Sequence, residues 1–161
     1  MRRKLGITAA LVVALAMAGY AQKKPDFSGT WTLDTEKSDP MPQRQGGGGG
    51  GGGGMGAVPM TIKQTADALT IERTFNGNTN STSYTLDGTE KEIQMMGRGG
   101  QPTTAKAKAK WDGDKIVIET TREGQNGPVT TKAKYSLDGA NLVVETETAN
   151  GTRKSVYKKT T

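Results

Sequence analysis

Residues 104–111 read Thr-Ala-Lys-Ala-Lys-Ala-Lys-Trp, and the strict alternation in this stretch decides the fold class. Successive side chains of a β-strand point to opposite faces of its sheet, so the alanines and Trp111 share one face and the lysines share the other. Lysine is rarely buried, and the alanine face is therefore the inner one. The stretch predicts a half-buried strand that ends in a tight turn at Asp112-Gly113.

The same alternation continues on both sides of this strand, in short runs separated by turn residues. Asn-Gly or Asp-Gly pairs, which are typical of tight β-hairpins, begin at positions 76, 87, 112, 126, 138 and 150. Such turns join strands that lie side by side, so the pattern predicts a sequential antiparallel meander. The ten expected strands are residues 28–34, 60–64, 69–75, 82–86, 92–95, 104–111, 115–121, 129–137, 141–147 and 153–157.

A meander of this length exposes two long edges unless it curls until its first and last strands pair. Closure removes both edges, so the sequence predicts an all-β protein, an antiparallel up-and-down meander of about ten strands closed into a barrel. A β-sandwich is the alternative. The residues expected to face inward are Ile62, Leu69, Ile71, Tyr84, Leu86, Ile93, Ile116, Ile118, Tyr135, Leu137, Leu142 and Val144.

Residues 1–21 are expected to be a signal peptide. They combine a basic start, an apolar run from Ile7 to Ala18, and small residues at Gly19 and Ala21, which are the features of a cleaved secretory leader. The apolar run is shorter than the roughly 20 residues that span a bilayer, so no membrane span is expected in the mature chain. We therefore expect a periplasmic or secreted protein that begins after Ala21.

The mature chain, residues 22–161, is expected to form a single barrel domain and a monomer. Its one interruption is residues 35–59, which contain Pro40, Pro42 and an unbroken glycine run at 46–54. Polyglycine has great backbone freedom and no side chains to pack, so this stretch predicts a flexible Gly/Pro-rich loop.

The composition removes several functional classes. The chain has no cysteine and no histidine, so zinc sites built on those residues, thiol nucleophiles and Ser-His-Asp triads are absent. The strand and loop carboxylates, such as Asp34, Glu72, Glu119 and Glu145, are explained by solvated positions. We expect no catalytic residue, no metal site and no cofactor, and therefore no enzyme.

The charge argues against nucleic acid as a partner. The chain carries 22 basic and 16 acidic residues, and three of the basic ones lie in the leader, which leaves +3 for the mature protein. Nucleic-acid binders concentrate basic residues in one stripe, whereas the lysines here alternate along strand faces. A small apolar ligand is the expected partner.

The alanine face of residues 104–111 fills little volume inside the expected barrel. Barrels of eight or more strands can enclose a small ligand. The candidate ligand-binding residues are therefore inward side chains, namely Tyr84, Ala107, Ile118 and Tyr135. The alternative is that these side chains only fill the interior, because pockets are few per protein.

Trp31, in the first expected strand, has two interpretations. In the structural one it plugs the closed end of the barrel, stacked under a cation from the last strand, because the first and last strands of a closed barrel meet. In the functional one it contacts a ligand. We favour the plug.

Several of these residues resemble the calycin group, which comprises the lipocalins and the cytosolic fatty-acid-binding proteins. Residues 28–31, Ser-Gly-Thr-Trp, are similar to their Gly-x-Trp opening, and residues 111–116 and 137–142 resemble the late hairpins of fatty-acid-binding proteins. Residues 152–158 resemble the terminal Arg-x-Tyr strand of those proteins, and small secreted bacterial proteins of lipocalin-like type share this pattern. The resemblance implies a lipocalin-like barrel around a cavity for fatty acids or other apolar molecules.

The resemblance also implies roles for the last strand. In fatty-acid-binding proteins the terminal Arg and Tyr hold the ligand carboxylate, which implies ligand contacts for Arg153 and Tyr157. The two residues are four apart here instead of two, so they share one strand face but lie further from each other. The alternative for Arg153 is a structural role, closing the barrel over Trp31. The family's helical lid would fall at residues 35–59, where polyglycine disfavours a helix.

The sequence thus favours a secreted or periplasmic, lipocalin-like binder of a small apolar or amphipathic ligand. The alternative is a non-catalytic structural or interaction module of the cell envelope with a filled barrel. The volume and lining of the interior distinguish the two, because ligand pockets occupy about 300 Å3 or more.

Overall fold

The computed structural model describes residues 24–40, 58–75, 77–96, 101–124 and 126–160. These residues form ten antiparallel strands and no helix, so the all-β prediction is confirmed. Each expected strand is present, most of them a few residues longer than expected. The strands are β1 (Gly29–Leu33), β2 (Met60–Gln64), β3 (Ala68–Phe75), β4 (Asn78–Thr85), β5 (Asp87–Met96), β6 (Pro102–Asp112), β7 (Lys115–Gly124), β8 (Gly127–Asp138), β9 (Asn141–Thr148) and β10 (Gly151–Thr160).

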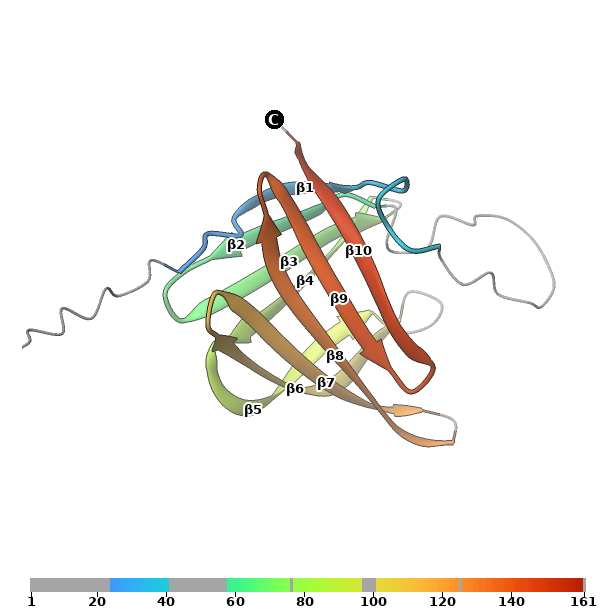
Figure 1. The fold of residues 1–161 in the computed structure, drawn as a ribbon. Helices are drawn as coiled ribbons and strands as arrows, with labels where there is room; N and C mark the ends of the chain where they lie inside the picture. Colours follow the sequence, from blue (N-terminus) through green and yellow to red (C-terminus); the bar gives the residue numbers. More distant parts are fainter. Residues whose placement is uncertain (1–23, 41–57, 76, 97–100, 125, 161) are drawn as a thin grey trace, which may run out of the picture.

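The strands follow one another around a nearly closed barrel, in the order β4-β3-β2-β1-β10-β9-β8-β7-β6-β5 (Figure 1). The first and last strands pair, with Trp31 opposite Lys159 and Leu33 opposite Tyr157. Closure by the terminal strands is therefore confirmed. Within the described residues, β4 and β5 are consecutive strands that share no backbone ladder. We call this β4–β5 junction the seam.

The hairpin turns form where the Asp-Gly pairs predicted them. Gly113 and Gly139 each take the first position of a two-residue loop and have φ angles of 63° and 60°. A type II′ turn requires a positive φ at this position, which glycine adopts without steric cost. The turn residues therefore fix the register of the hairpins that they close.

The core lies along the inner face of the barrel. Nearly all the residues expected to face inward are buried, and Ile62, Leu69, Ile116 and Leu142 are at most 1% exposed. Tyr84 is half-buried. Leu137 shares the inward face, since it lies opposite the buried Leu142, but it is 36% exposed because it lies one residue before the end of β8.

Trp31 is buried in the core together with Phe27, which precedes β1. Its indole is 2% exposed, and its Nε1 donates a hydrogen bond of 2.9 Å to the carbonyl of Phe27. Phe27 is wholly buried and stacks on Trp111 with ring centroids 6.0 Å apart. The cation over the Trp31 ring is Lys159 of β10, with Nζ 5.4 Å from the ring centroid. Lys159, and not Arg153, therefore stands over Trp31.

The start of the expected Gly/Pro-rich loop runs along β10. The Asp34 amide donates to the Val156 carbonyl over 2.8 Å, and the Asp39 amide donates to the Lys154 carbonyl over 2.9 Å. The expected signal peptide at 1–21 and residues 41–57 of the loop lie outside the described residues. In the part of the chain that is described, no helix is long and apolar enough to cross a membrane.

Candidate ligand-binding site

The inner wall from β6 to β10 carries one level of mostly small side chains. The residues in register at this level are Ala109, Ile118, Ala133, Thr146 and Arg153. They face the interior because they keep the phase of the buried residues on their strands. The structure therefore places two residues predicted from the sequence, Ile118 and Arg153, on the same level of the wall, beside alanines that occupy little volume.

Three tyrosines face the interior near one another. Tyr135 and Tyr157 are buried, and Tyr84 is half-buried. Burial raises the pKa of the Tyr135 phenol far above its usual value; the neighbouring phenols of Tyr84 and Tyr157 add to this rise, and the charge of Arg73 opposes it. Burial also raises the pKa of Tyr84, again opposed by Arg73. The hydroxyls of Tyr84 and Tyr135 therefore stay protonated at neutral pH.

Arg73 belongs to this group, although the sequence analysis did not select it. It follows Leu69 and Ile71 at alternate positions of β3, so its side chain enters the barrel interior. Its Nη2 lies 3.2 Å from the sulfur of Met60, a weak acceptor. Its Nε is buried and has no hydrogen-bond acceptor. An arginine on the apolar face of a strand is the signal that could have identified it.

A pocket of about 80 Å3 opens at the seam. The backbone ladder is missing there, and the described side chains that join the strands are few. Thr82 Oγ1 donates to the Gln94 carbonyl over 3.2 Å, and Lys91 Nζ donates to Thr85 Oγ1 over 2.9 Å. The residues that line the pocket are Ser83, Tyr84, Thr85, Thr89, Lys91, Glu92, Ile93, Ala107 and Ala109. Two predicted site residues, Tyr84 and Ala107, therefore meet at the seam.

Arg153 and Tyr157 both face the interior from β10, with Ser155 between them. Arg153 Nη2 lies 3.2 Å from the hydroxyl oxygen of Ser155, to which it donates, and its Nε is buried without an acceptor. Tyr157 is 4% exposed and lies opposite Leu142, on the level of the apolar core. The two residues therefore belong to different levels of the interior.

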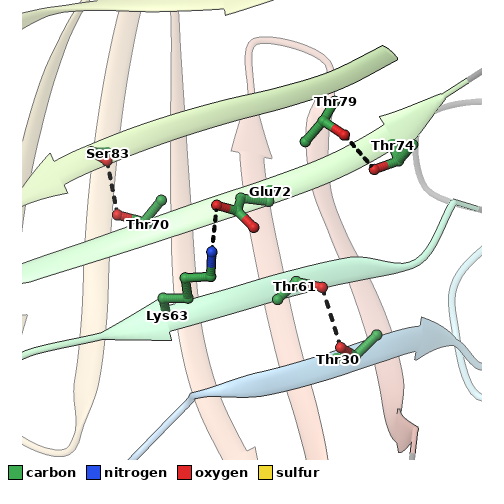
Figure 2. A network of polar contacts seen from close by, with 8 residues as sticks. All are labelled: Thr30, Thr61, Lys63, Thr70, Glu72, Thr74, Thr79 and Ser83. Carbon is green, nitrogen blue, oxygen red and sulfur yellow. Dashed lines mark hydrogen bonds and ion pairs between the residues drawn. The ribbon is translucent and has the colours of Figure 1, made fainter. Parts of the chain in front are cut away.

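On the outer faces of several strands, polar and charged side chains pair with partners on the neighbouring strand. On the outside of β1 to β4, hydroxyls pair across strands, as in Thr70 with Ser83 at 2.8 Å, and Lys63 Nζ lies 2.8 Å from Glu72 Oε1 (Figure 2). On the outside of β8 and β9, Lys134 pairs with Glu147 at 2.5 Å. These exposed charges balance one another and leave no single-sign surface on these strands.

The described residues hold no cluster of three or more acidic side chains that could bind a metal ion. Asp34, one of the carboxylates considered in the sequence, is 3% exposed at its side chain and forms an ion pair of 2.9 Å with Lys158. Glu72 pairs with Lys63 on the outer face. Their contacts are those of structural ion pairs.

Comparison with known proteins gives structural but no sequence matches. No protein-family model and no curated sequence matches the chain. Among solved structures, the fatty acid transporter REP1-NXSQ is similar with a TM-score of 0.56 and 12% identity, over 83% of this chain and 96% of that one. Human cRBP IV gives 0.59 and 20%, over 84% and 99%. A variant of the fluorescent protein UnaG gives 0.57 and 16%, over 84% and 96%.

The fold is that of a calycin-type β-barrel, as the resemblance of the first and last strands implied. Ten sequential antiparallel strands and the pairing of the first strand with the last are the features of this fold in the chain. At 12% to 20% identity the likeness extends to the fold alone.

Proposed function

We propose that the protein is a secreted or periplasmic binder of a small apolar or amphipathic ligand, which it holds inside the barrel. The observation that carries the proposal is the mixed lining of the interior. Small alanines of β6 lie beside buried phenols and two arginines whose Nε atoms have no acceptor. Buried polar groups without partners cost free energy, and a barrel that serves only as a scaffold gains nothing from them.

By the volume criterion stated for the interior, the seam pocket taken alone favours a filled barrel, and the ligand proposal requires the seam to widen. Its pocket of about 80 Å3 is smaller than the roughly 300 Å3 of a typical ligand site. A ligand of that size therefore requires β4 and β5 to separate, and the described contacts across them are side-chain bonds, which can break without disturbing a ladder. One of the structures with a similar fold is that of a fatty acid transporter.

A filled structural barrel is the second candidate. Fourteen buried residues form one continuous apolar cluster that extends from Phe27 to Ile118 and Tyr157. Such a cluster is what an interaction module without a ligand would need for stability. The two candidates predict different experimental results. A binder releases a bound ligand on extraction and then takes up an added probe, whereas a filled barrel does neither.

The test is ligand recovery followed by titration. The protein is isolated without denaturant, extracted with organic solvent and analysed by mass spectrometry, and the delipidated protein is titrated with a dansyl-labelled undecanoate. We expect recovered amphiphiles, saturable fluorescence, and weaker binding by Arg153→Met. If the protein yields no extractable ligand and shows no saturable binding, the ligand proposal fails and a structural or interaction module with a filled barrel remains.

A matched pair of variants locates the ligand. Ala107→Leu places three more carbons in the seam pocket and should weaken dansyl-undecanoate binding at least tenfold. Lys108→Leu, the next residue of β6, points outward and should leave affinity unchanged. Circular dichroism of both variants checks that the barrel is intact. Equal affinities would place the ligand away from the seam.

The proposed location has its own test. The full chain is expressed with its leader in a bacterial host, and the soluble periplasmic protein is sequenced from its N-terminus. Cleavage after Ala21 predicts a mature chain that begins at Gln22. An uncleaved chain in the cytoplasm would contradict the proposed export and leave the ligand proposal intact.

A further inference from the structure

The charges of the barrel wall are sorted by face. On the described strands, acidic side chains alternate with the inward positions and lie outside; Glu72, Glu119 and Glu145 are examples. Among the basic side chains of the described strands, those of Arg73 and Arg153 lie on the inward face with their Nε atoms buried. The interior therefore carries positive charge with no carboxylate of the described strands on the same face.

Arg73 is the less compensated of the two arginines. Arg153 has the Ser155 hydroxyl as an acceptor. The Nη2 atom of Arg73 donates to the thioether sulfur of Met60 over 3.2 Å, and the buried Nε atom of Arg73 has no acceptor. A buried cation is stable only when it is paired and hydrogen-bonded, so this guanidinium has an unused capacity for an anion.

The surroundings of Arg73 supply further donors. Its charge acts on the phenols of both Tyr84 and Tyr135, whose pKa values remain raised by burial. Both phenols thus stay neutral next to the cation, and each can donate a hydrogen bond to an anion. Tyr84 also lines the seam pocket, which connects this cluster to the opening between β4 and β5.

We infer that the ligand is an organic anion with an apolar tail, and that its negative group binds Arg73 on β3, with the Tyr84 and Tyr135 hydroxyls as neighbouring donors. The inference rests on the proposed function and differs from what the terminal strand implied, because the anchor is Arg73 and Arg153 is secondary. The bound anion replaces Met60 as the partner of the guanidinium, and the tail lies along the alanine face of β6.

The test compares two probes that differ only in charge, a dansyl-labelled undecanoate and its methyl ester. The wild-type protein should bind the carboxylate about tenfold or more tightly than the ester, as one charge-assisted hydrogen bond provides. Arg73→Met should remove this preference while the affinity for the ester stays unchanged. Arg73→Lys, which keeps the charge without the planar fork, should retain part of the preference. The matched control, Arg153→Met, should retain most of it.

Each outcome decides the inference. Binding of neither probe overturns the proposed function and the inference together. Equal binding of both probes by the wild type overturns the inference alone, and so does a preference lost in Arg153→Met but kept in Arg73→Met. If Arg73→Met does not fold, an NMR titration of the wild-type protein takes its place. The titration follows the Nε–H resonance of Arg73, which is assigned by its absence in Arg73→Lys. That resonance should shift with the carboxylate and not with the ester, and an unchanged resonance overturns the inference.

Discussion

The barrel has two junctions that could have been its opening, and they are built differently. At β1–β10 a ladder of four residue pairs runs from Thr30 opposite Thr160 to Leu33 opposite Tyr157, and the Asp34 amide continues it. At the seam, the described contacts are side-chain hydrogen bonds, such as that of Thr82 to the Gln94 carbonyl, and the packing of Tyr84 against the cluster of Ile93, Ala105 and Ala107. The first and last strands are therefore joined by a backbone ladder, and the gap in the ladder lies between two strands that are consecutive in the chain.

Two features of β4 and β5 accompany the missing ladder at the seam. β4 reads Asn-Thr-Asn-Ser-Thr-Ser-Tyr-Thr, which offers few apolar side chains to pack across to β5. The register of β5 against β6 shifts between Asp87 and Glu90, a bulge that bends the start of the strand. Bulges of this kind increase the local twist and turn an edge away from its neighbour.

The largest effect is expected from Trp31→Ala at the β1–β10 junction. The indole is almost fully buried and packs with Phe27 and Lys159, so its removal leaves a large cavity and should lower the free energy of unfolding by about 3 to 5 kcal/mol. Ile93→Ala at the seam is the counterpart and should cost about 2 kcal/mol, because Ile93 is a smaller side chain in a small cluster with Ala105 and Ala107, against which Tyr84 and Met95 pack. Urea unfolding measures both, and equal losses would contradict the contrast between the junctions.

The next effect concerns Gly29, which lies two residues before Trp31. Gly29 has a φ of 138°, and a Cβ placed there would lie 2.5 Å from Cε of Lys159. Gly29→Ala should therefore strain the backbone and displace Lys159 from the indole, with a loss of about 1 to 3 kcal/mol. Gly77→Ala, where a Cβ meets nothing within 4 Å, is the control and should cost only its backbone strain, about 1 kcal/mol. A smaller loss at Gly29 than at Gly77 would contradict the packing role of Lys159.

A smaller effect is expected at the seam itself. Thr82→Val keeps the shape of the side chain but removes its hydrogen bond to the Gln94 carbonyl, which should cost about 1 kcal/mol. Amide hydrogen exchange should accelerate in β4 and β5 and stay unchanged in β9 and β10. Thr70→Val, which removes only an exposed hydroxyl pair with Ser83, is the control and should change little. Exchange that accelerates equally in all four strands would show that the seam does not open locally.

The fold was predictable because it follows from local rules. Alternation in residues 104–111 and the Asp-Gly turns determine the strands, their order and the direction of each side chain. The position of the opening was not predictable in this way. Whether β4 and β5 pair depends on the bulge at Asp87–Glu90 and on packing across the gap, which are properties of the assembled barrel.

The site was predictable in part for a similar reason. Tyr84 and Ala107 are inward by alternation, and the structure brings both to the seam pocket. Arg73 was missed because only aliphatic and aromatic residues were selected as inward on this strand, although its phase with Leu69 and Ile71 makes it an inward residue as well. Phe27 was missed because it precedes the first strand, and only the fold shows that it stacks on Trp111.

The final prediction separates the junctions by their response to acid. The hydrogen bond from Lys158 holds the pKa of Asp34 below its usual value of 3.8, and the hydrogen bond from Thr89 does the same for Asp87 at the start of β5. A lowered pKa in the folded state means that the unfolded chain binds more protons, so each carboxylate stabilises the fold above the usual pKa, and this stability is lost as the pH falls through the folded value.

The side chain of Asp34 is 3% exposed and that of Asp87 is 44% exposed, so solvent screens the second far more. Asp34→Asn should therefore flatten the loss of stability between neutral pH and about pH 3 more than Asp87→Asn, as measured by urea unfolding across that range. If the two variants flatten it equally, the Lys158 ion pair contributes no more to the β1–β10 junction than a surface contact does.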